Sequence, residues 1–385
     1  ISAKPNVVSI IAQDGNHNSM GRAINIIISG GGTGGHLYPA LAIGDEIMAR
    51  HPHANIHYVG STFGIEKDVL PVKNVNHSLL SIRGFQRSFT LKSIGKNLLL
   101  PGRLIASIGQ IKSLFDSINP DLVIGTGGYA CALPLREAIR KDVPTLIQEQ
   151  NSYPGITTRW FADKAKKVCI AFEEAQSYIK NKCILTGNPV RKEISLGNKE
   201  NGIKQFGFSP NKKTLFLFGG SQGSLALNQA MDKMIQSFSI SNTQVIWQTG
   251  KTHFTNYRHH DNELCTVIPF IDDMANAYAA SDLVLSRSGA ITCSELTVCG
   301  KPSILIPFPA AAADHQTKNA LSLAEHGAAS IIAEDNLIPE KTANLIQNML
   351  DQKSQLKEMA DASLKLGKPK ATLDIVNHAM ELIQS

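Results

Sequence analysis

A glycine-rich loop that ends in a histidine is the first stretch of the chain whose residue types could do chemistry. Gly30–Gly35 holds five glycines in six positions, and His36 follows directly. Glycines let backbone N–H groups approach a ligand closely, and a helix start adds positive partial charge, so the loop is typical of phosphate binding. The same location disfavours the imidazolium ion, which would leave His36 able to take a proton. A lone glycine loop can also be only a tight turn.

The elements that must position this loop form a repeated pattern. An apolar run at 24–28 predicts a buried strand before the loop, and Pro39 predicts the first residue of the helix after it. Residues 214–235 repeat this strand, glycine loop and helix, while 120–150 and 281–307 share a second version of it.

Alternating β and α segments of this kind predict parallel sheets with right-handed crossovers. The sequence therefore predicts an α/β protein with two doubly wound, Rossmann-like parallel sheets. Ligands of such sheets bind at the carboxyl ends of the strands, which places the expected site in a cleft between two domains.

We expect a first domain over residues 21–187, a second over 188–367, and a C-terminal helix over 368–385 that packs back on the first. The polar run 193–213 is expected to be a linker, and residues 1–20 a disordered extension.

The composition excludes several classes of function. The 385-residue chain is 43% hydrophobic and 18% charged, as in a soluble globular protein, and its net charge of +6 is too small to indicate nucleic-acid binding. Six scattered cysteines without a C-x-x-C pair indicate neither a disulfide framework nor a zinc site. No uncharged apolar run reaches the roughly 18 residues of a membrane span. No D-x-D motif stands at a strand end, so we expect no protein-bound metal and no cofactor.

A basic, leucine-rich stretch at 89–112 has two interpretations. It contains Leu98, Leu99, Leu100 and Leu104 among lysines and arginines, and it has no acidic residue. It could be a helix with an apolar face toward the core, or a surface that enters a membrane interface beside anionic headgroups.

The loops taken together resemble those of the MurG family of glycosyltransferases. The shared motifs, in family order, are GGGTGGH (30–36), GTGGY (125–129), EQN (149–151), GNPVR (187–191), GGSQG (219–223), FIDDM (270–274), RSGAITCSE (287–295) and DHQTKNA (314–320). The resemblance runs from about residue 23 to the C-terminus. It implies the GT-B fold, in which two Rossmann-like domains face each other across a cleft.

The resemblance also implies an activity and partners. The expected reaction is inverting transfer of N-acetylglucosamine from UDP-GlcNAc to the C4 hydroxyl of undecaprenyl-diphospho-MurNAc-pentapeptide (lipid I), which forms lipid II. The expected location is the cytoplasmic face of the inner membrane, as a peripheral protein on an anionic surface, with cell-wall synthesis proteins as possible further partners.

The family pattern assigns roles to residues of this chain. His36 is the expected catalytic base. Ser221 is expected at the donor diphosphate, Arg191 near the uracil, Ile271 at the uracil edge through its backbone, and Glu295 at the ribose hydroxyls. The full set expected to bind UDP-GlcNAc is Thr33, Gly34, Gly35, Asn151, Arg191, Ser221, Ile271, Ala290, Ile291, Thr292, Cys293, Ser294, Glu295 and Gln316.

The acceptor's diphosphate is expected at the second glycine loop, on Gly127, Gly128 and Tyr129, with the amides of Gly34 and Gly35 nearby.

The chain departs from the usual family pattern at two positions. Gln148 stands where a histidine is frequent, and Ser152 where a glycine is frequent. The alternatives to the transferase are a UDP-GlcNAc 2-epimerase of the same fold and a non-catalytic nucleotide-sugar-binding subunit at the membrane. An NAD-dependent dehydrogenase is disfavoured because no acidic residue ends the second strand, where Val59-Gly60-Ser61 stands.

Overall fold

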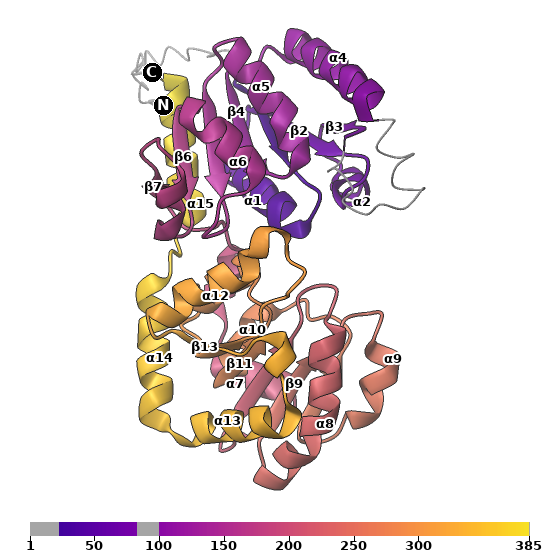
Figure 1. The fold of residues 1–385 in the computed structure, drawn as a ribbon, viewed down its shortest axis with the longest axis vertical. Helices are drawn as coiled ribbons and strands as arrows, with labels where there is room; N and C mark the ends of the chain where they lie inside the picture. The colour runs from indigo at the N-terminus through magenta and orange to yellow at the C-terminus, as the bar shows by residue number, and fades with distance from the viewer. Residues whose placement is uncertain (1–22, 83–99, 385) are drawn as a thin grey trace, which may run out of the picture.

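Two parallel β-sheets, one above the other, organise the protein (Figure 1). The structure is a computed structural model and describes residues 23–82 and 100–384. The first sheet has the strand order β3-β2-β1-β4-β5-β6-β7, and the second has the order β10-β9-β8-β11-β12-β13. Counted from its own first strand, each sheet contains the doubly wound order 3-2-1-4-5-6, to which the first sheet adds a seventh strand at its edge. The repeat seen in the sequence is therefore a repeat of topology.

The first half contains seven strands in the described ranges, which are β1 (Asn25–Gly30), β2 (Asn55–Ser61), β3 (His77–Leu80), β4 (Leu122–Gly127), β5 (Thr145–Glu149), β6 (Lys167–Ile170) and β7 (Ile184–Leu185). Its helices are α1 (Gly34–Arg50), α2 (Glu66–Val72), α4 (Leu100–Ile118), α5 (Ala132–Arg140) and α6 (Ile156–Phe161), with short 3₁₀ turns η1 (Tyr129–Cys131), η2 (Ala162–Lys164) and η3 (Glu173–Tyr178).

The second half contains the strands β8 (Thr214–Phe218), β9 (Gln244–Gln248), β10 (Cys265–Ile268), β11 (Leu283–Ser286), β12 (Ser303–Leu305) and β13 (Ala329–Ile331). Its helices are α7 (Lys199–Gln205), α8 (Leu225–Ser241), α9 (Phe254–Tyr257), α10 (Met274–Ala280), α11 (Ala290–Val298), α12 (His315–Glu325), α13 (Pro339–Asp351) and α14 (Lys353–Leu366), with 3₁₀ turns η4 (Lys192–Leu196), η5 (Arg258–His260), η6 (Ala312–Asp314) and η7 (Glu334–Asn336).

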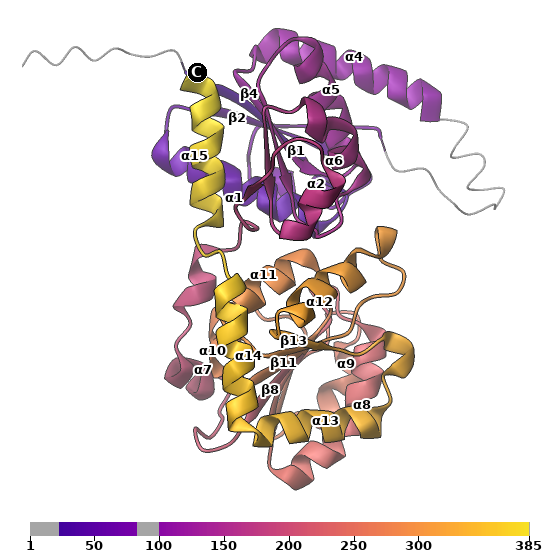
Figure 2. The same ribbon diagram turned by 60° about the vertical axis from the view of Figure 1, so that its left-hand side comes forward.

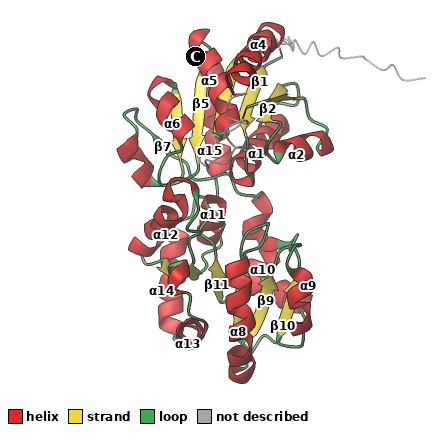
Figure 3. Cartoon of the chain, turned by 45° about the vertical axis from the view of Figure 1, so that its right-hand side comes forward, coloured by secondary structure: helices red, strands yellow, loops and turns green. Residues whose placement is uncertain are grey.

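Helices cover both faces of each sheet (Figure 3), which explains why the central strands are apolar throughout. In β1, Ile26 and Ile28 belong to the core cluster shared with α1, whereas Ile27 belongs to the cluster on the opposite face. In β8, Leu215 and Phe216 divide between two clusters in the same way. A continuous apolar run thus satisfies both faces of a buried parallel strand.

The last helix, α15 (Ala371–Gln384), follows the second half in sequence and packs on the first (Figure 2). Ile375 and Val376 are buried in the core cluster that contains Ile26. Arg50 Nη1 of α1 also donates a hydrogen bond to Asn377 Oδ1 at 2.7 Å. The chain therefore crosses between the halves twice.

Two expectations about local structure were wrong. Helix α1 begins at Gly34, and Pro39 lies inside it; proline costs this helix one hydrogen bond, to the carbonyl of Gly35. The run 193–213 is no free linker, because it forms η4 and α7. Ile194, Ile203 and Phe206 are buried in a core cluster of the second half, and this burial outweighs the polar composition of the run.

Helix α4 combines the two interpretations of the basic stretch. Ile111 and Phe115 are buried in the first half, whereas Leu104 is 46% and Ile105 is 71% exposed. Leu98, Leu99, the side chain of Leu100 and the expected extension at 1–20 lie outside the described residues. Among the helices described, none has the length and apolar character needed to cross a bilayer.

Candidate active site

The glycine loops lie where the strand order of each sheet reverses. In the first sheet they follow β1 and β4, and in the second they follow β8 and β11, which are the two central pairs of neighbours. This switch point leaves a crevice at the carboxyl ends of the strands, where ligands of doubly wound sheets bind. Hydrogen bonds join Asn151 and Ser152, which lie just after β5, to Asn319 of α12, so the carboxyl ends of the first sheet face the second half.

Two amides of the first loop are used inside the protein. Gly31 N–H donates to Gly127 O at 3.3 Å, and Gly32 N–H donates to the carboxylate of Glu66 at 2.9 and 3.0 Å. Glu66 is fully buried and also accepts from the Ser61 amide at 2.7 Å. Glu66 thus holds the loop in place, and nothing in its sequence context marks it.

The anion-binding capacity of this loop lies at the helix start. Within the described residues, the amides of Thr33, Gly34 and Gly35 have no protein partner and stand at the N-terminus of α1. These three are the expected substrate-binding residues of the first loop.

The second glycine loop packs against the first. A Cβ on Gly127 would lie 2.8 Å from His36 Nδ1, and a Cβ on Gly128 would lie 2.1 Å from Gly31 O. Both glycines also have positive φ, so larger residues are excluded by the backbone conformation as well as by the lack of space. Gly127 is buried and Tyr129 is 48% exposed, so of the three expected acceptor residues Tyr129 is the most accessible.

The hydrogen bonds of His36 define its tautomer. Its Nδ1 lies 2.8 Å from Gln150 Oε1 and 3.1 Å from the carbonyl of Thr126. Both oxygens can only accept, so Nδ1 carries a proton, and of the two neutral tautomers the structure fits the one with its lone pair on Nε2. His36 is half-buried.

Across the interface, Glu295 is the buried carboxylate of α11. It is 8% exposed, its Oε2 accepts a hydrogen bond from the Tyr278 hydroxyl at 3.0 Å, and its Oε1 lies 3.7 Å from Arg191 Nη2. Burial raises the pKa of Glu295, while Arg191 and the Tyr278 hydroxyl oppose the rise. The structure therefore brings the expected ribose and uracil residues together.

Gln248, which sequence analysis missed, joins two expected donor-binding segments. Its Nε2 donates to the Gly220 carbonyl at 3.1 Å, and its Oε1 accepts from the Ile271 amide at 2.8 Å. The amide of Ile271 is thus engaged within the protein and is not available to a ligand. Ser221 is exposed. A polar residue at the carboxyl end of an apolar strand was the signal that could have revealed Gln248.

Helix α11 offers the amides of its first turn, on Ala290, Ile291 and Thr292. Cys293 differs: its thiol is buried with a pKa raised to about 12, and its N–H donates to the Gly289 carbonyl at 2.9 Å. Neither group of Cys293 is therefore presented to a ligand.

Two more residues expected to bind UDP-GlcNAc have side chains that already form hydrogen bonds within the protein. The Ser294 hydroxyl accepts from Asn188 at 2.9 Å and donates to the Ala290 carbonyl at 3.1 Å. Gln316 Oε1 accepts from the Phe308 amide at 3.0 Å. The Gln316 NH₂ group has no protein partner in the described parts of the chain.

Asn319 binds the two halves together. Its Oδ1 accepts from the Ser152 amide and hydroxyl at 3.0 and 3.1 Å. Its Nδ2 lies 3.2 Å from Asn151 Oδ1 and 3.3 Å from the Ser288 carbonyl. The hydroxyl contact depends on Ser152 and is one that glycine, frequent here in the family, could not make.

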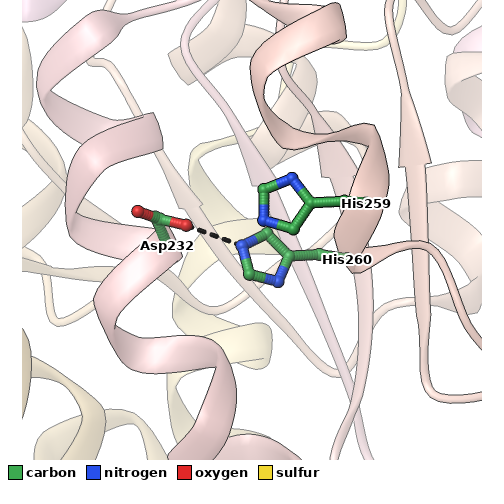
Figure 4. Close-up of side chains that lie close together, drawn as sticks. All are labelled: Asp232, His259 and His260. Carbon is green, nitrogen blue, oxygen red and sulfur yellow. Dashed lines mark hydrogen bonds and ion pairs between the residues drawn. The ribbon is translucent and has the colours of Figure 1, made fainter.

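A possible metal-binding group lies elsewhere. Asp232, His259 and His260 come together on α8 and η5 (Figure 4), and His260 Nε2 lies 2.6 Å from Asp232 Oδ1. These elements carry none of the expected substrate-binding residues, so we assign this group no part in the site.

The fold and the site define a class, the glycosyltransferases of the GT-B fold. The structure of MurG from Acinetobacter baumannii superimposes with a TM-score of 0.76 at 24% identity, covering 93% of this chain and 99% of that one. Residues 26–170 match the glycosyltransferase family 28 N-terminal domain, and residues 214–375 match the C-terminal domain of that family. The expected fold class is confirmed.

Close relatives specify the family further. A protein of Christiangramia forsetii is 40% identical over 95% of this chain and 100% of its own length, and one of Flavobacterium psychrophilum is 41% identical over 93% and 98%. Both are named UDP-N-acetylglucosamine–N-acetylmuramyl-(pentapeptide) pyrophosphoryl-undecaprenol N-acetylglucosamine transferase. The chain belongs to the MurG family of glycosyltransferases.

The bonds of Asn319 generate a prediction about the interface. Asn319→Leu leaves the Ser152 amide and hydroxyl without an acceptor, so the free energy of unfolding should fall by about 1–3 kcal/mol. Hydrogen exchange at the Ser152 amide should become faster.

The matched control is Asn228→Leu, because Asn228 is equally buried but bonds to Trp247 and Thr249 within the second half. The Asn228→Leu variant should lose a similar free energy of unfolding, but hydrogen exchange at the Ser152 amide should not become faster. Undiminished protection of Ser152 in Asn319→Leu would show that Asn319 does not hold the interface.

Proposed function

We propose that this protein transfers N-acetylglucosamine from UDP-GlcNAc to the C4 hydroxyl of lipid I, forming lipid II for cell-wall synthesis. The observation that carries the proposal is the hydrogen bonding of His36, whose Nδ1 contacts Gln150 Oε1 and the Thr126 carbonyl, so that Nε2 is the ring nitrogen without a protein partner among the described residues. The names of the close relatives support the same reaction.

The chemistry follows from these groups. The acceptor C4 oxygen forms a bond to C1 of the sugar while the bond from C1 to the diphosphate oxygen breaks, which inverts C1 and gives a β-1,4 link. The hydroxyl proton goes to His36 Nε2, as in general base catalysis. The amides of Ala290–Thr292 and of Gly220–Gln222 stabilise the charge that develops on the leaving UDP, whereas the Gly223 amide donates to the Gly220 carbonyl.

The remaining donor residues bind and orient. Glu295 accepts hydrogen bonds from the ribose hydroxyls, the Ile271 carbonyl accepts from the uracil edge, and Arg191 compensates negative charge near the nucleotide. We divide the chain accordingly into an acceptor domain at 21–187, a donor domain at 188–367, and a C-terminal helix at 368–385 that belongs structurally to the first.

The decisive assay uses purified protein, labelled UDP-GlcNAc and lipid I or a short-chain analogue. Transfer of label to the lipid is expected. Release of UDP without an acceptor would support an epimerase, and binding of UDP-GlcNAc without any turnover would support a non-catalytic subunit.

We further propose that α4 binds the cytoplasmic face of the inner membrane peripherally. Leu104 and Ile105 are exposed on it, and Arg103 lies 5.3 Å above the ring of Phe63, which is itself 47% exposed. Apolar side chains beside cationic ones suit an anionic bilayer surface, where lipid I resides. Cell-wall synthesis proteins would meet the enzyme at the same surface.

His36→Ala should lower kcat with lipid I by about 10²-fold or more, because the attacking hydroxyl then lacks its base. The affinity for UDP should stay nearly unchanged, since His36 lies in the acceptor half. A general base must be unprotonated to act, so a plot of kcat against pH should fall on the acidic side for the parent enzyme. This acidic limb should be absent from the variant. A folded variant with parental kcat and the same acidic limb would exclude His36 as the base.

Glu295→Gln should weaken UDP binding by about 1.5–3 kcal/mol, the range for a hydrogen bond to a charged group. Because burial raises the pKa of Glu295, UDP affinity of the parent should fall on acidification at a higher pH than an exposed carboxyl would give. Calorimetry at several pH values measures both effects. Glu358→Gln, on the exposed face of α14, is the control, and equal UDP affinity in the two variants would remove Glu295 from the site.

Leu104→Glu with Ile105→Glu should reduce binding to anionic liposomes at least tenfold, because two apolar side chains leave the interface and two negative charges enter it. Both positions are exposed, so the thermal melt should stay cooperative. Leu364→Glu is the control, since Leu364 is 55% exposed on α14 of the other half. Equal sedimentation of both variants with liposomes would show that α4 does not bind the bilayer.

A further inference from the structure

A chain of buried side-chain amides runs from His36 to the start of α11. Gln150 Oε1 lies 2.8 Å from His36 Nδ1, and the side chains of Gln150 and Gln148 are hydrogen-bonded to each other. Gln148 Nε2 donates to Asn188 Oδ1 at 2.9 Å, and Asn188 Nδ2 donates to the Ser294 hydroxyl at 2.9 Å. Each of the three amide residues is at most 1% exposed. The chain thus connects the proposed base with the helix proposed to bind the donor diphosphate.

Main-chain carbonyls determine the direction of this chain. Gln150 Nε2 lies 2.8 Å from the Thr126 carbonyl and 3.0 Å from that of Gln148, and Asn188 Nδ2 lies 3.0 Å from the Gln150 carbonyl. Carbonyls only accept, so each NH₂ group must face them and each amide oxygen must face toward His36. Rotation of any amide would bring two acceptors together at a buried site, which is costly.

We propose that Gln148, Gln150 and Asn188 are positioning residues that hold His36 in the tautomer protonated on Nδ1 and couple this tautomer to the placement of α11. The effect of this tautomer on catalysis rests on the proposed function of His36. The tautomer itself is independent of that function. The links from Asn188 to Gln148 and to the Gln150 carbonyl require contact between the two halves. Nε2 of His36 is therefore held ready for the acceptor proton when the donor helix is in place.

The residue types suit this task. A carboxamide has a fixed donor and a fixed acceptor and does not titrate in the physiological range, unlike histidine. Gln148 stands where the family often has histidine, so in this protein the direction of the chain does not depend on pH.

The first test replaces the residue that contacts the ring. In Gln150→Met, the ¹⁵N spectrum of the imidazole should show a larger population protonated on Nε2, and the signals of His36 are identified by their absence in His36→Ala. kcat should fall about five- to tenfold, the effect of one hydrogen bond, with an unchanged KM for UDP-GlcNAc. Gln244→Met is the matched control, because Gln244 is an equally buried glutamine at the start of β9.

The second test acts at the far end. Asn188→Leu, and the milder Ser294→Ala, should shift the same His36 signals although neither residue contacts the ring. An unchanged tautomer in Gln150→Met overturns the proposal, and a shift in Gln150→Met but in neither distal variant overturns the coupling to α11. These outcomes are separate from the function of the histidine, since loss of kcat in His36→Ala tests the base whatever its tautomer.

Discussion

Two buried asparagines hold the carboxyl ends of the two sheets against each other, and the arrangement of the site depends on them. Asn319 binds the Asn151–Ser152 segment of the first half, and Asn188 bonds to Gln150 on one side and to Ser294 on the other. The proposed base lies on one half and the proposed donor site on the other, so the proposed reaction requires the two halves to meet in one register. Buried amides suit this purpose because a buried donor or acceptor without a partner costs more free energy than a formed hydrogen bond contributes.

The glycine loops have a structural function as well as a binding one. Gly127 and Gly128 allow the second loop to pack on the first, and Glu66 takes the Gly32 amide that could otherwise face an anion. In the described part of the chain, the amides of Thr33, Gly34 and Gly35 are the ones that remain for substrate in this loop. The abundance of glycine thus reflects close packing of two loops as much as access for phosphate.

The central elements were predictable because each carries a strong local signal. The buried strand at 24–28, the strand, loop and helix within 214–235 and the C-terminal helix were expected near their observed bounds, and the repeat predicted two sheets of one topology. The start of α1 and the fold of 193–213 were not, because Pro39 and a polar composition are weak preferences that tertiary packing overrides. Gln248 and Glu66 were missed for a related reason, since each contacts a segment distant in sequence.

The sequence by itself determined the α/β class, the twofold repeat and the family, because apolar periodicity, glycine loops and motif order are all local properties of the chain. Only the tertiary structure decided the tautomer of His36, the availability of each amide and the placement of Cys293 in the core. The physical reason is that hydrogen bonding and burial depend on partners from distant segments. Thr126 and Gln150 are 90 and 114 residues from His36, and no local pattern shows that their oxygens converge on its ring.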